Sequence, residues 1–162
     1  MTDHQHHRKI LVLDIDNTIL DVMRYGEKFV FRPGFPEFIT KARAHFDRIY
    51  LFTAGWKEHA NKTQELINDL YHIQLDGVFW NDHMTDPWLG GKSMDIVRKF
   101  GQLAANDHIV FLDDLTENLT KDDANDSFVH FLCVLPFYAS DAFGKNETDE
   151  TYLFNLPIWN VC

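Results

Sequence analysis

The sequence has few cysteines, no long apolar run and a shortage of basic residues, and each of these shortages excludes a class of protein. The 162 residues include only two cysteines, Cys133 within an apolar run and Cys162 at the last position, so a disulfide framework is not expected. No run of roughly 18 apolar residues is present, and residues 1–9 are polar and histidine-rich, without the apolar core of a signal peptide. We therefore expect no membrane segment and a cytoplasmic location.

Basic residues are outnumbered by acidic ones. Lys and Arg number 15 against 25 Asp and Glu, which gives a net charge of -10. This charge opposes broad contact with a phosphate backbone, so nucleic acid is a disfavoured partner. A monomer is expected.

The composition is that of one packed domain. Hydrophobic residues make up 45% of the chain and aromatic residues 14%, and no internal repeat or linker divides it. We predict a flexible tail at residues 1–9 and a single domain over residues 10–162. The histidines of the tail, His4, His6 and His7, are given no role.

Short continuous apolar runs predict strands that are buried on both faces, as in parallel sheets. Between these runs the apolar residues recur at helical spacing. Strands that alternate with helices imply right-handed crossovers, and hence an α/β, Rossmann-like, three-layer fold with a mostly parallel sheet. The predicted strands are 10–13, 48–52, 77–80, 108–112 and 128–135, and the predicted helices are 36–46, 60–71 and 94–103, with surface loops at 121–126 and 144–151.

Polar residues stand where three of the predicted strands end. Asp14, Thr53 and Asp113 each follow or close an apolar run. Ligands of open parallel sheets bind beyond the carboxyl ends of the strands, so these side chains are predicted to meet in one site. The loop Gly90-Gly91 is predicted to deliver Lys92 to the start of a helix beside them.

Asp14 and Asp16 can divide the labour of a phosphoryl transfer. One carboxylate attacks phosphorus, while the other, with a pKa raised by its neighbour or by burial, protonates the leaving oxygen and then activates water. Thr18 is predicted to hydrogen-bond back and orient Asp16. A turn or helix-cap role for the two carboxylates is the alternative.

An anionic nucleophile that attacks an anionic phosphate needs positive charge nearby. Mg2+ prefers oxygen ligands, and Asp113 and Asp114 would complete its site, with one of them contacting the ion directly. Lys92 would neutralise charge on the transferred group. The hydroxyl of Thr53 and nearby backbone amides, such as that of Ala54, would hold the phosphate oxygens.

Four motifs occur in order between Ile10 and Asp114: Asp14-x-Asp16-x-Thr18, Thr53, Lys92 and Asp113-Asp114. In this order they resemble the four motifs of the haloacid dehalogenase superfamily of phosphatases. The resemblance implies that Asp14 is the nucleophile and a magnesium ligand. It implies that Asp16 is the general acid/base and also binds magnesium through its carbonyl, and that Asp113 or Asp114 completes the metal site. Thr53 and Lys92 would be the phosphate binders.

Two further segments, 32–38 with Arg-Pro-Gly and 51–55 with Phe-Thr-Ala, the second followed by His59-Ala60, resemble the branch of C-terminal-domain and nuclear-LIM-interactor-like phosphatases. That branch acts mainly on phosphoserine in proteins. The sequence departs from it at Ile15-Asp16-Asn17, where the branch favours Leu-Asp-Glu, and at Asp114, where it often has Asn. These departures bear on the substrate more than on the chemistry.

The spacing of the strands limits the inserts. About 30 residues separate the first two apolar runs, and part of that length is helical, so no large cap domain is expected. An open site suits phosphate on a protein. A nucleotide or nucleic-acid 3'-phosphatase is the alternative enzyme, and an inactive binding module of the same fold is the alternative outside enzymes.

Several polar and aromatic residues near the motifs have open or minor roles. Arg32 either binds a substrate anion or braces its loop. Glu117 and Asn118 are interpreted as a solvated loop rather than as part of the metal site. Trp56 is placed at the rim of the pocket, Trp80 and Trp88 in a local core, and His59, His72 and His83 on a helix surface or in loops.

Overall fold

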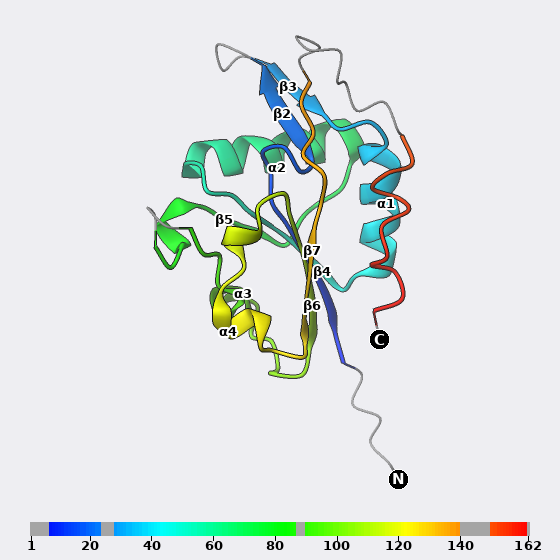
Figure 1. Ribbon diagram of the computed structural model, residues 1–162. Coiled ribbons are helices and arrows are strands. Elements are labelled where there is room, and N and C mark those ends of the chain that lie inside the picture. Colours follow the sequence, from blue (N-terminus) through cyan, green and yellow to red (C-terminus); the bar gives the residue numbers. More distant parts are fainter. Residues whose placement is uncertain (1–6, 24–27, 87–89, 140–149, 162) are drawn as a thin grey trace.

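A computed structural model describes residues 7–23, 28–86, 90–139 and 150–161, and its centre is a five-stranded sheet (Figure 1). The strand order is β5-β4-β1-β6-β7, and every adjacent pair is parallel. The predicted mostly parallel α/β sheet is therefore confirmed. The strands are β1 (Lys9–Leu13), β4 (Arg48–Phe52), β5 (Gly77–Phe79), β6 (His108–Asp113) and β7 (Val129–Cys133).

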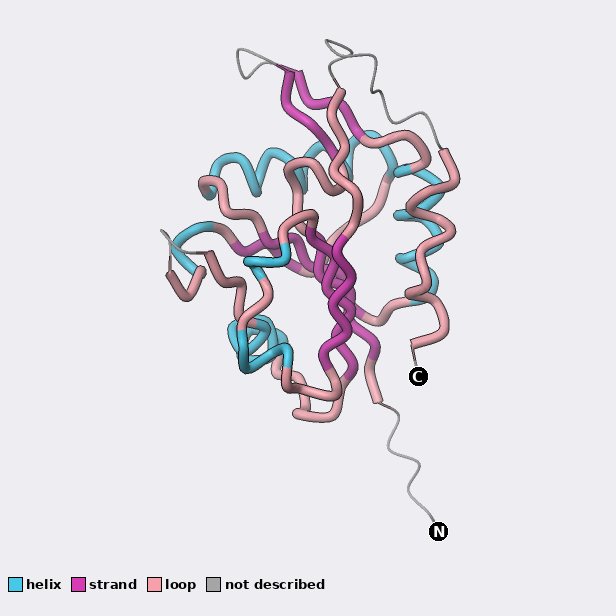
Figure 2. Tube along the Cα trace, in the orientation of Figure 1, coloured by secondary structure: helices cyan, strands magenta, loops and turns pink. Residues whose placement is uncertain are grey.

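Helices cover both faces of the sheet (Figure 2). Alternate strand residues such as Leu11 and Leu13 pack in one core cluster with α1 and α2, whereas Ile10 and Val12 pack in a second cluster with α3. This two-sided burial explains why the strands are continuous apolar runs. The helices are α1 (Phe35–His45), α2 (Lys57–Tyr71), α3 (Met94–Gly101) and α4 (Lys121–Ala124), with 3-10 turns η1 (Asn81–His83) and η2 (Thr116–Asn118).

An antiparallel hairpin lies between β1 and α1. Its strands are β2 (Leu20–Met23) and β3 (Lys28–Phe31), and it forms a separate two-stranded sheet. The hairpin was not predicted. Within the described residues it is the whole insert between β1 and α1, and no large cap covers the sheet.

Several predicted boundaries differ from the structure. Arg8 pairs with Asp107, with 3.2 Å between Nε and Oδ2, and β1 begins at Lys9, so these two residues, which the predicted tail 1–9 included, are part of the fold. The loop predicted at 121–126 contains α4, because the Thr120 hydroxyl accepts a hydrogen bond from the Asp123 backbone and caps that helix. The predictions for Trp88, for most of the loop 144–151 and for Cys162 lie outside the described residues.

Two apolar residues within the predicted helices 60–71 and 94–103 are largely exposed. Leu70 is 57% exposed and Phe100 is 63% exposed. Phe100 nevertheless contacts the rings of Tyr50 and Phe79, with centroids 6.0 and 5.5 Å away, and so lies at the edge of the second core cluster. Trp80 is half-buried and packs against the core cluster of α1 and α2, as its core interpretation predicts.

Candidate active site

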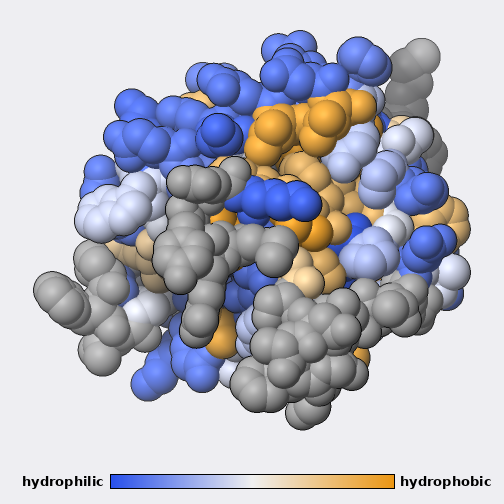
Figure 3. Space-filling view, turned by 90° about the horizontal axis from the view of Figure 1, so that it is seen from above, coloured by the Kyte–Doolittle hydropathy of each residue, from blue (hydrophilic) through white to orange (hydrophobic). Residues whose placement is uncertain are grey.

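The carboxyl ends of β1 and β6 are neighbours in the sheet. The chain leaves β1 toward β4 and β5 and later returns to β6 on the other side, so the switch point of the sheet lies between β1 and β6. Leu13 pairs with Leu112, and the Asp14 amide donates to the Leu112 carbonyl over 2.9 Å. Asp14 and Asp113 are thereby brought side by side. Strand β1 runs toward the end of the molecule that carries the hairpin (Figure 1), and Figure 3 shows that end from above.

The ammonium group of Lys92 lies between these two carboxylates. Its Nζ is 2.8 Å from Asp14 Oδ1 and 2.7 Å from Asp113 Oδ2, and Lys92 is fully buried. Burial disfavours the charged amine, but the two carboxylates outweigh it and raise the pKa of Lys92 above its usual value. Gly90 and Gly91, with φ of 87° and 109°, make the turn that places Lys92 here, as the sequence predicts.

Asp14 is almost completely buried. Desolvation raises the pKa of its carboxyl group from 3.8 to about 6, although the charge of Lys92 acts in the opposite direction. A hydrogen bond with the Asp114 carboxyl raises this pKa, and a hydrogen bond from Thr18 lowers it. The carboxyl groups of Asp14 and Asp114 thus lie together in one acidic site. A cation bound there would offset the cost of ionising both of them.

Thr18 contacts Asp14 rather than Asp16, so the predicted target of its hydroxyl is wrong. Oγ1 donates to Asp14 Oδ2 over 2.8 Å. The reason is a tight turn: Asn17 has a φ of 64°, and the amides of Thr18 and Ile19 both bond back to the carbonyl of Ile15. The turn brings Thr18 against Asp14, where its side chain is fully buried.

Asp16 faces a different set of groups. Its carboxylate oxygens lie 2.9 and 3.1 Å from Nε2 of His59, and Oδ2 lies 3.4 Å from the Thr53 hydroxyl. Thr53 Oγ1 also accepts the Gly55 amide at 3.0 Å, which fixes the loop after β4. His59 was expected on a helix surface, and the structure instead brings it into the site.

The structure distinguishes the two aspartates after β6. Asp113 is fully buried, and its oxygens accept from Lys92, from the Asn118 side chain at 3.0 Å and from the Leu115 amide at 2.9 Å. Asp114 is only half-buried and lies beside Asp14. Asp113 thus holds the surrounding groups in place, and Asp114 presents a carboxylate to the site.

Three carboxylates form a group suited to a metal ion. One oxygen from each of Asp14, Asp113 and Asp114 lies within 4.8 Å of the other two. Burial raises the pKa of each of these carboxyl groups, so bringing a divalent cation among them would remove an electrostatic cost. An all-oxygen donor set fits Mg2+ better than a softer transition metal.

Thr53, Ala54 and Arg32 are the other residues that the sequence predicted in or near the site. Thr53 is fully buried at the end of β4, and Ala54 is exposed directly after it. Arg32 is 1% exposed, its Nη1 donates to the Leu135 carbonyl over 2.7 Å, and its guanidinium lies 4.2 Å from the centre of the Tyr152 ring. This burial favours the bracing role for Arg32 over anion binding.

His59 and Asn118 are the two site residues that the sequence interpretation missed. Each follows a motif residue closely, His59 six positions after Thr53 and Asn118 five positions after Asp113. Asn118 is 5% exposed, and its carbonyl accepts the Lys92 amide at 2.7 Å, so it supports two members of the site. A polar residue in the first turn after a motif strand is the signal that could have identified both.

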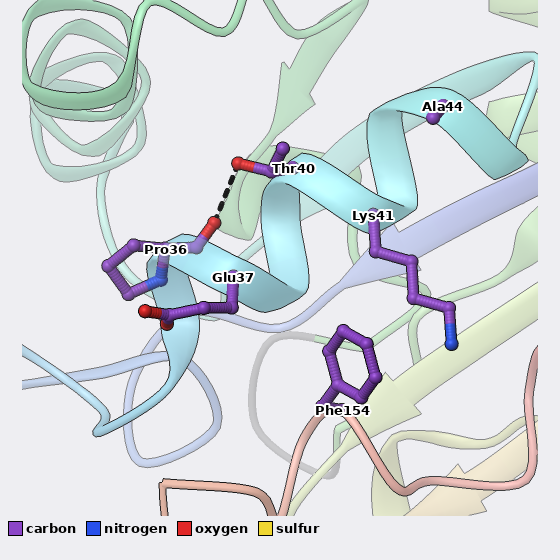
Figure 4. Close-up of a pocket in the computed structure, with 6 residues that line it drawn as sticks. All are labelled: Pro36, Glu37, Thr40, Lys41, Ala44 and Phe154. Carbon is purple, nitrogen blue, oxygen red and sulfur yellow. Dashed lines mark hydrogen bonds between the residues drawn. The ribbon is translucent and has the colours of Figure 1, made fainter.

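A separate hollow lies on α1 (Figure 4). It has a volume of about 570 Å³, and none of the predicted site residues lines it. Its walls are one side of α1 and the ring of Phe154. The lining residues are Pro36, Glu37, Thr40, Lys41, Ala44 and Phe154.

A profile of the NLI interacting factor-like phosphatase family matches residues 9–137 of the chain. The chain belongs to this family. The match spans the sheet and every site residue named above, and it confirms the resemblance drawn from the four motifs. Membership of this phosphatase family also supports the prediction that the chain is an enzyme.

Solved structures of Fcp1 share the fold of this family member. A fission yeast Fcp1 variant bound to beryllium fluoride, an RNA polymerase II CTD phosphatase, is 20% identical with a TM-score of 0.58 over 90% of the chain. A second Fcp1 structure is 19% identical with a TM-score of 0.59 over 86% of the chain. The chain spans less than half of each, 45% and 44%. The comparison with curated proteins gave no match.

The described residues contain no helix that is long and apolar enough to cross a membrane. The longest helix, α2, has 15 residues and an amphipathic pattern with Ala60, Thr63 and Ile67 on its buried side. A helix needs about 20 apolar residues to span the hydrocarbon core.

Proposed function

We propose that the chain hydrolyses phosphate monoesters through an aspartyl-phosphate on Asp14, with Mg2+ as cofactor and phosphoserine or phosphothreonine in proteins as substrate. The observation that carries this proposal is the buried group of Asp14, Lys92 and Asp113 at the switch point of the sheet. Asp114 shares a hydrogen bond with Asp14, and Asp16, two residues after Asp14, has its carboxyl group beside Thr53 and His59. A nucleophile, a cation and a second carboxylate are the parts that phosphoryl transfer needs.

In the first step a carboxylate oxygen of Asp14 attacks phosphorus. The bond between phosphorus and the ester oxygen breaks, and the leaving oxygen takes a proton from Asp16. Lys92 and the backbone amides after Thr53 stabilise the charge on the equatorial oxygens. The products of this step are an alcohol and a phosphoryl group on Asp14.

In the second step water attacks the phosphoryl group. Asp16, now ionised, takes a proton from this water, and the bond between phosphorus and the Asp14 oxygen breaks. Inorganic phosphate leaves, and Asp14 and Asp16 return to their starting protonation states. Because one residue gives a proton and then takes one, its carboxyl group must be reachable from the pocket, and the Asp16 side chain is 44% exposed.

The residues present fit a magnesium ion. Asp14 and Asp114 would bind it directly, the carbonyl of Asp16 would add a third protein ligand, and Asp113 would hold Lys92 in place. When bound, Mg2+ supplies Lewis-acid polarisation of a phosphate oxygen and offsets the charge of the carboxylates.

A phosphoprotein substrate is supported by the open site and its surroundings. The segments after β4, β6 and β7 expose apolar side chains: Trp56 is 71% exposed, Leu115 is 51% exposed and Leu135 is 61% exposed. The end of the molecule that carries the hairpin shows an apolar area bordered by hydrophilic residues (Figure 3). Exposed apolar groups next to a catalytic site suit a macromolecular partner. The Fcp1 structures, which are described as CTD phosphatases, add support from relatives.

Two other functions are less well supported. A nucleotide 3'-phosphatase would use the same residues, but the net charge of -10 disfavours a polynucleotide. An inactive binding module has no need of a buried Lys92 between two carboxylates. A monomeric state and a cytoplasmic location are predictions that accompany this proposal.

The test compares the wild-type protein with Asp14→Asn on p-nitrophenyl phosphate, a phosphoserine peptide and a nucleoside 3'-monophosphate, with Mg2+ and with a chelator. We expect magnesium-dependent turnover by the wild type, highest kcat/KM on the peptide, and none by the variant. Inactivity of the wild type on all three would overturn the enzymatic proposal. Full activity of Asp14→Asn would overturn the nucleophile assignment alone, and a preference for the nucleotide would overturn the substrate assignment.

A further inference from the structure

Asp16 must hold its carboxyl group toward the leaving oxygen, yet few groups restrain it. Nearly half of its side chain is exposed, and the Thr53 hydroxyl is 3.4 Å away, which is a long hydrogen bond. The close contacts are those to His59, whose Nε2 lies 2.9 Å from Oδ1 and 3.1 Å from Oδ2. His59 therefore determines where this carboxyl group points.

His59 is itself firmly held. It lies in the first turn of α2, its ring stacks on Phe29 of the hairpin with centroids 5.4 Å apart and planes at 25°, and its side chain is 18% exposed. Its backbone carbonyl accepts the Thr63 hydroxyl at 2.9 Å. A Cβ at Gly55 would approach the imidazole to 3.3 Å, so the loop after β4 also closes around the ring. The ring is thus held by Phe29 and by the loop at Gly55, and an imidazole fixed in this way can fix a carboxylate.

We propose that His59 is a positioning residue that holds the Asp16 carboxyl group in the orientation required for proton transfer to the leaving group. The inference rests on the proposed function, because it assigns a partner to the general acid of that reaction. In the state that protonates the leaving group, Asp16 carries its proton on the oxygen that faces the substrate, and the Nε2–H of His59 donates to the other oxygen; a neutral and a protonated imidazole can both make this bond. The role is therefore one of geometry, and it does not depend on the charge of the imidazole.

The chemistry predicts a selective defect when this contact is lost. A serine alkoxide is a poor leaving group and needs the proton from Asp16 in the transition state, whereas p-nitrophenolate departs with little help. An unrestrained Asp16 would occupy the productive orientation only part of the time. A misplacement of about 1 Å in a catalytic group lowers rates by roughly 100-fold when the group is fully required.

The experiment compares kcat/KM for a phosphoserine peptide and for p-nitrophenyl phosphate. This ratio reports the steps up to transfer of phosphate to Asp14, so slow hydrolysis of the phosphoenzyme does not obscure the result. For His59→Ala we expect a loss of roughly 10- to 100-fold on the peptide and of less than about 3-fold on the aryl ester. Glu58→Ala, on the exposed neighbouring position of α2, is the matched control and should change neither value.

A second pair of variants separates positioning from folding. The amide nitrogen of Gln can reach the place of His59 Nε2, whereas that of Asn is one methylene short. His59→Gln should restore most of the peptide activity, and His59→Asn should not, although both variants carry the same polar group and should unfold at similar temperatures.

Equal losses on the two substrates, or equal activities of the Gln and Asn variants, would overturn the role of His59 while leaving the proposed phosphatase intact. An inactive wild type would instead overturn the proposed function, and this inference with it. The two failures therefore give different results in the same set of assays.

Discussion

The Nζ atom of Lys92 lies 2.8 Å from Oδ1 of Asp14, and the lysine is fully buried. The ammonium group is also 2.7 Å from Asp113, so one cation is paired with two carboxylates in the interior. A buried ion pair contributes little net stability, but removing one partner leaves an uncompensated charge. The stability of this fold is therefore linked to the group that is expected to bind phosphate.

Replacing Lys92 with Met should expose this link. The variant leaves Asp14 and Asp113 buried without their cation, and we expect its free energy of unfolding at pH 7 to fall by roughly 3–5 kcal/mol. Phosphatase activity should fall by roughly 100-fold or more, because the cation that stabilises the transferred group is lost. Urea denaturation and steady-state assays measure the two effects. Lys99→Met, at an exposed position of α3, should change stability by less than about 0.5 kcal/mol; a similar loss in both variants would contradict the prediction.

The raised pKa of Asp14 predicts an unusual dependence of stability on pH. The folded value of about 6 lies above the ordinary value of 3.8, so ionisation of Asp14 costs the folded state free energy at pH 7. That cost disappears as the pH falls below 6 toward 3.8. Relative to Asp14→Asn, the free energy of unfolding of the wild type should rise by up to about 3 kcal/mol between about pH 7 and about pH 4.

Urea unfolding at several pH values, with a chelator present, measures this difference. Groups that do not interact with Asp14 change the stability of both proteins in parallel, so the comparison reports Asp14 together with its coupled neighbours Lys92, Asp113 and Asp114. A difference that is constant with pH, or that shrinks on acidification, would show that Asp14 is not held in an unfavourable ionised state. Added Mg2+ should reduce the slope, since the cation stabilises the ionised carboxylate.

The sheet and its site edge could be predicted because they depend on local patterns. Runs such as 10–13 and 108–112 are apolar at every position, which is what a strand buried on both faces requires. The four-residue strands β2 and β3 are too short for a period of two to stand out. The ends of parallel strands meet at one edge, so the convergence of Asp14 and Asp113 followed from the fold alone.

The details of the site depend on geometry that spacing does not determine. The left-handed backbone of Asn17, with a φ of 64°, turns Thr18 toward Asp14. Helix α2 begins at Lys57 rather than at Ala60, which brings His59 into its first turn at the site edge. A single dihedral angle and a shift of three residues thus decide two side-chain contacts. Neither the dihedral angle of Asn17 nor the first residue of α2 changes the pattern of apolar residues, so the sequence pattern could not predict them.

The two aspartates after β6 should respond differently to substitution. Asp114 presents its carboxylate to the site, so Asp114→Ala should weaken Mg2+ binding by roughly 100-fold or more and leave the fold intact. Asp113 accepts hydrogen bonds from the Lys92 ammonium group and the Asn118 amide. Asp113→Asn should lower the stability of the metal-free protein, because the new amide NH2 group would face these two donors. Isothermal titration with Mg2+ and thermal unfolding with a chelator separate the effects. Tight Mg2+ binding by Asp114→Ala would exclude it as a direct ligand.

Substitution of Thr18 tests whether its hydroxyl acts on Asp14 or on Asp16. Thr18→Val removes the 2.8 Å bond to Asp14 Oδ2 at a fully buried position, and should cost about 1–3 kcal/mol of stability. Because the hydroxyl lowers the pKa of Asp14, its loss should also shift the acidic limb of the kcat/KM profile to higher pH. Thr18→Ser keeps the bond and is the control. A defect confined to substrates with poor leaving groups would instead assign the hydroxyl to Asp16, since only the general acid distinguishes an alkyl from an aryl ester. An equal loss on both esters, together with the shifted profile, is the result that the turn at Asn17 predicts.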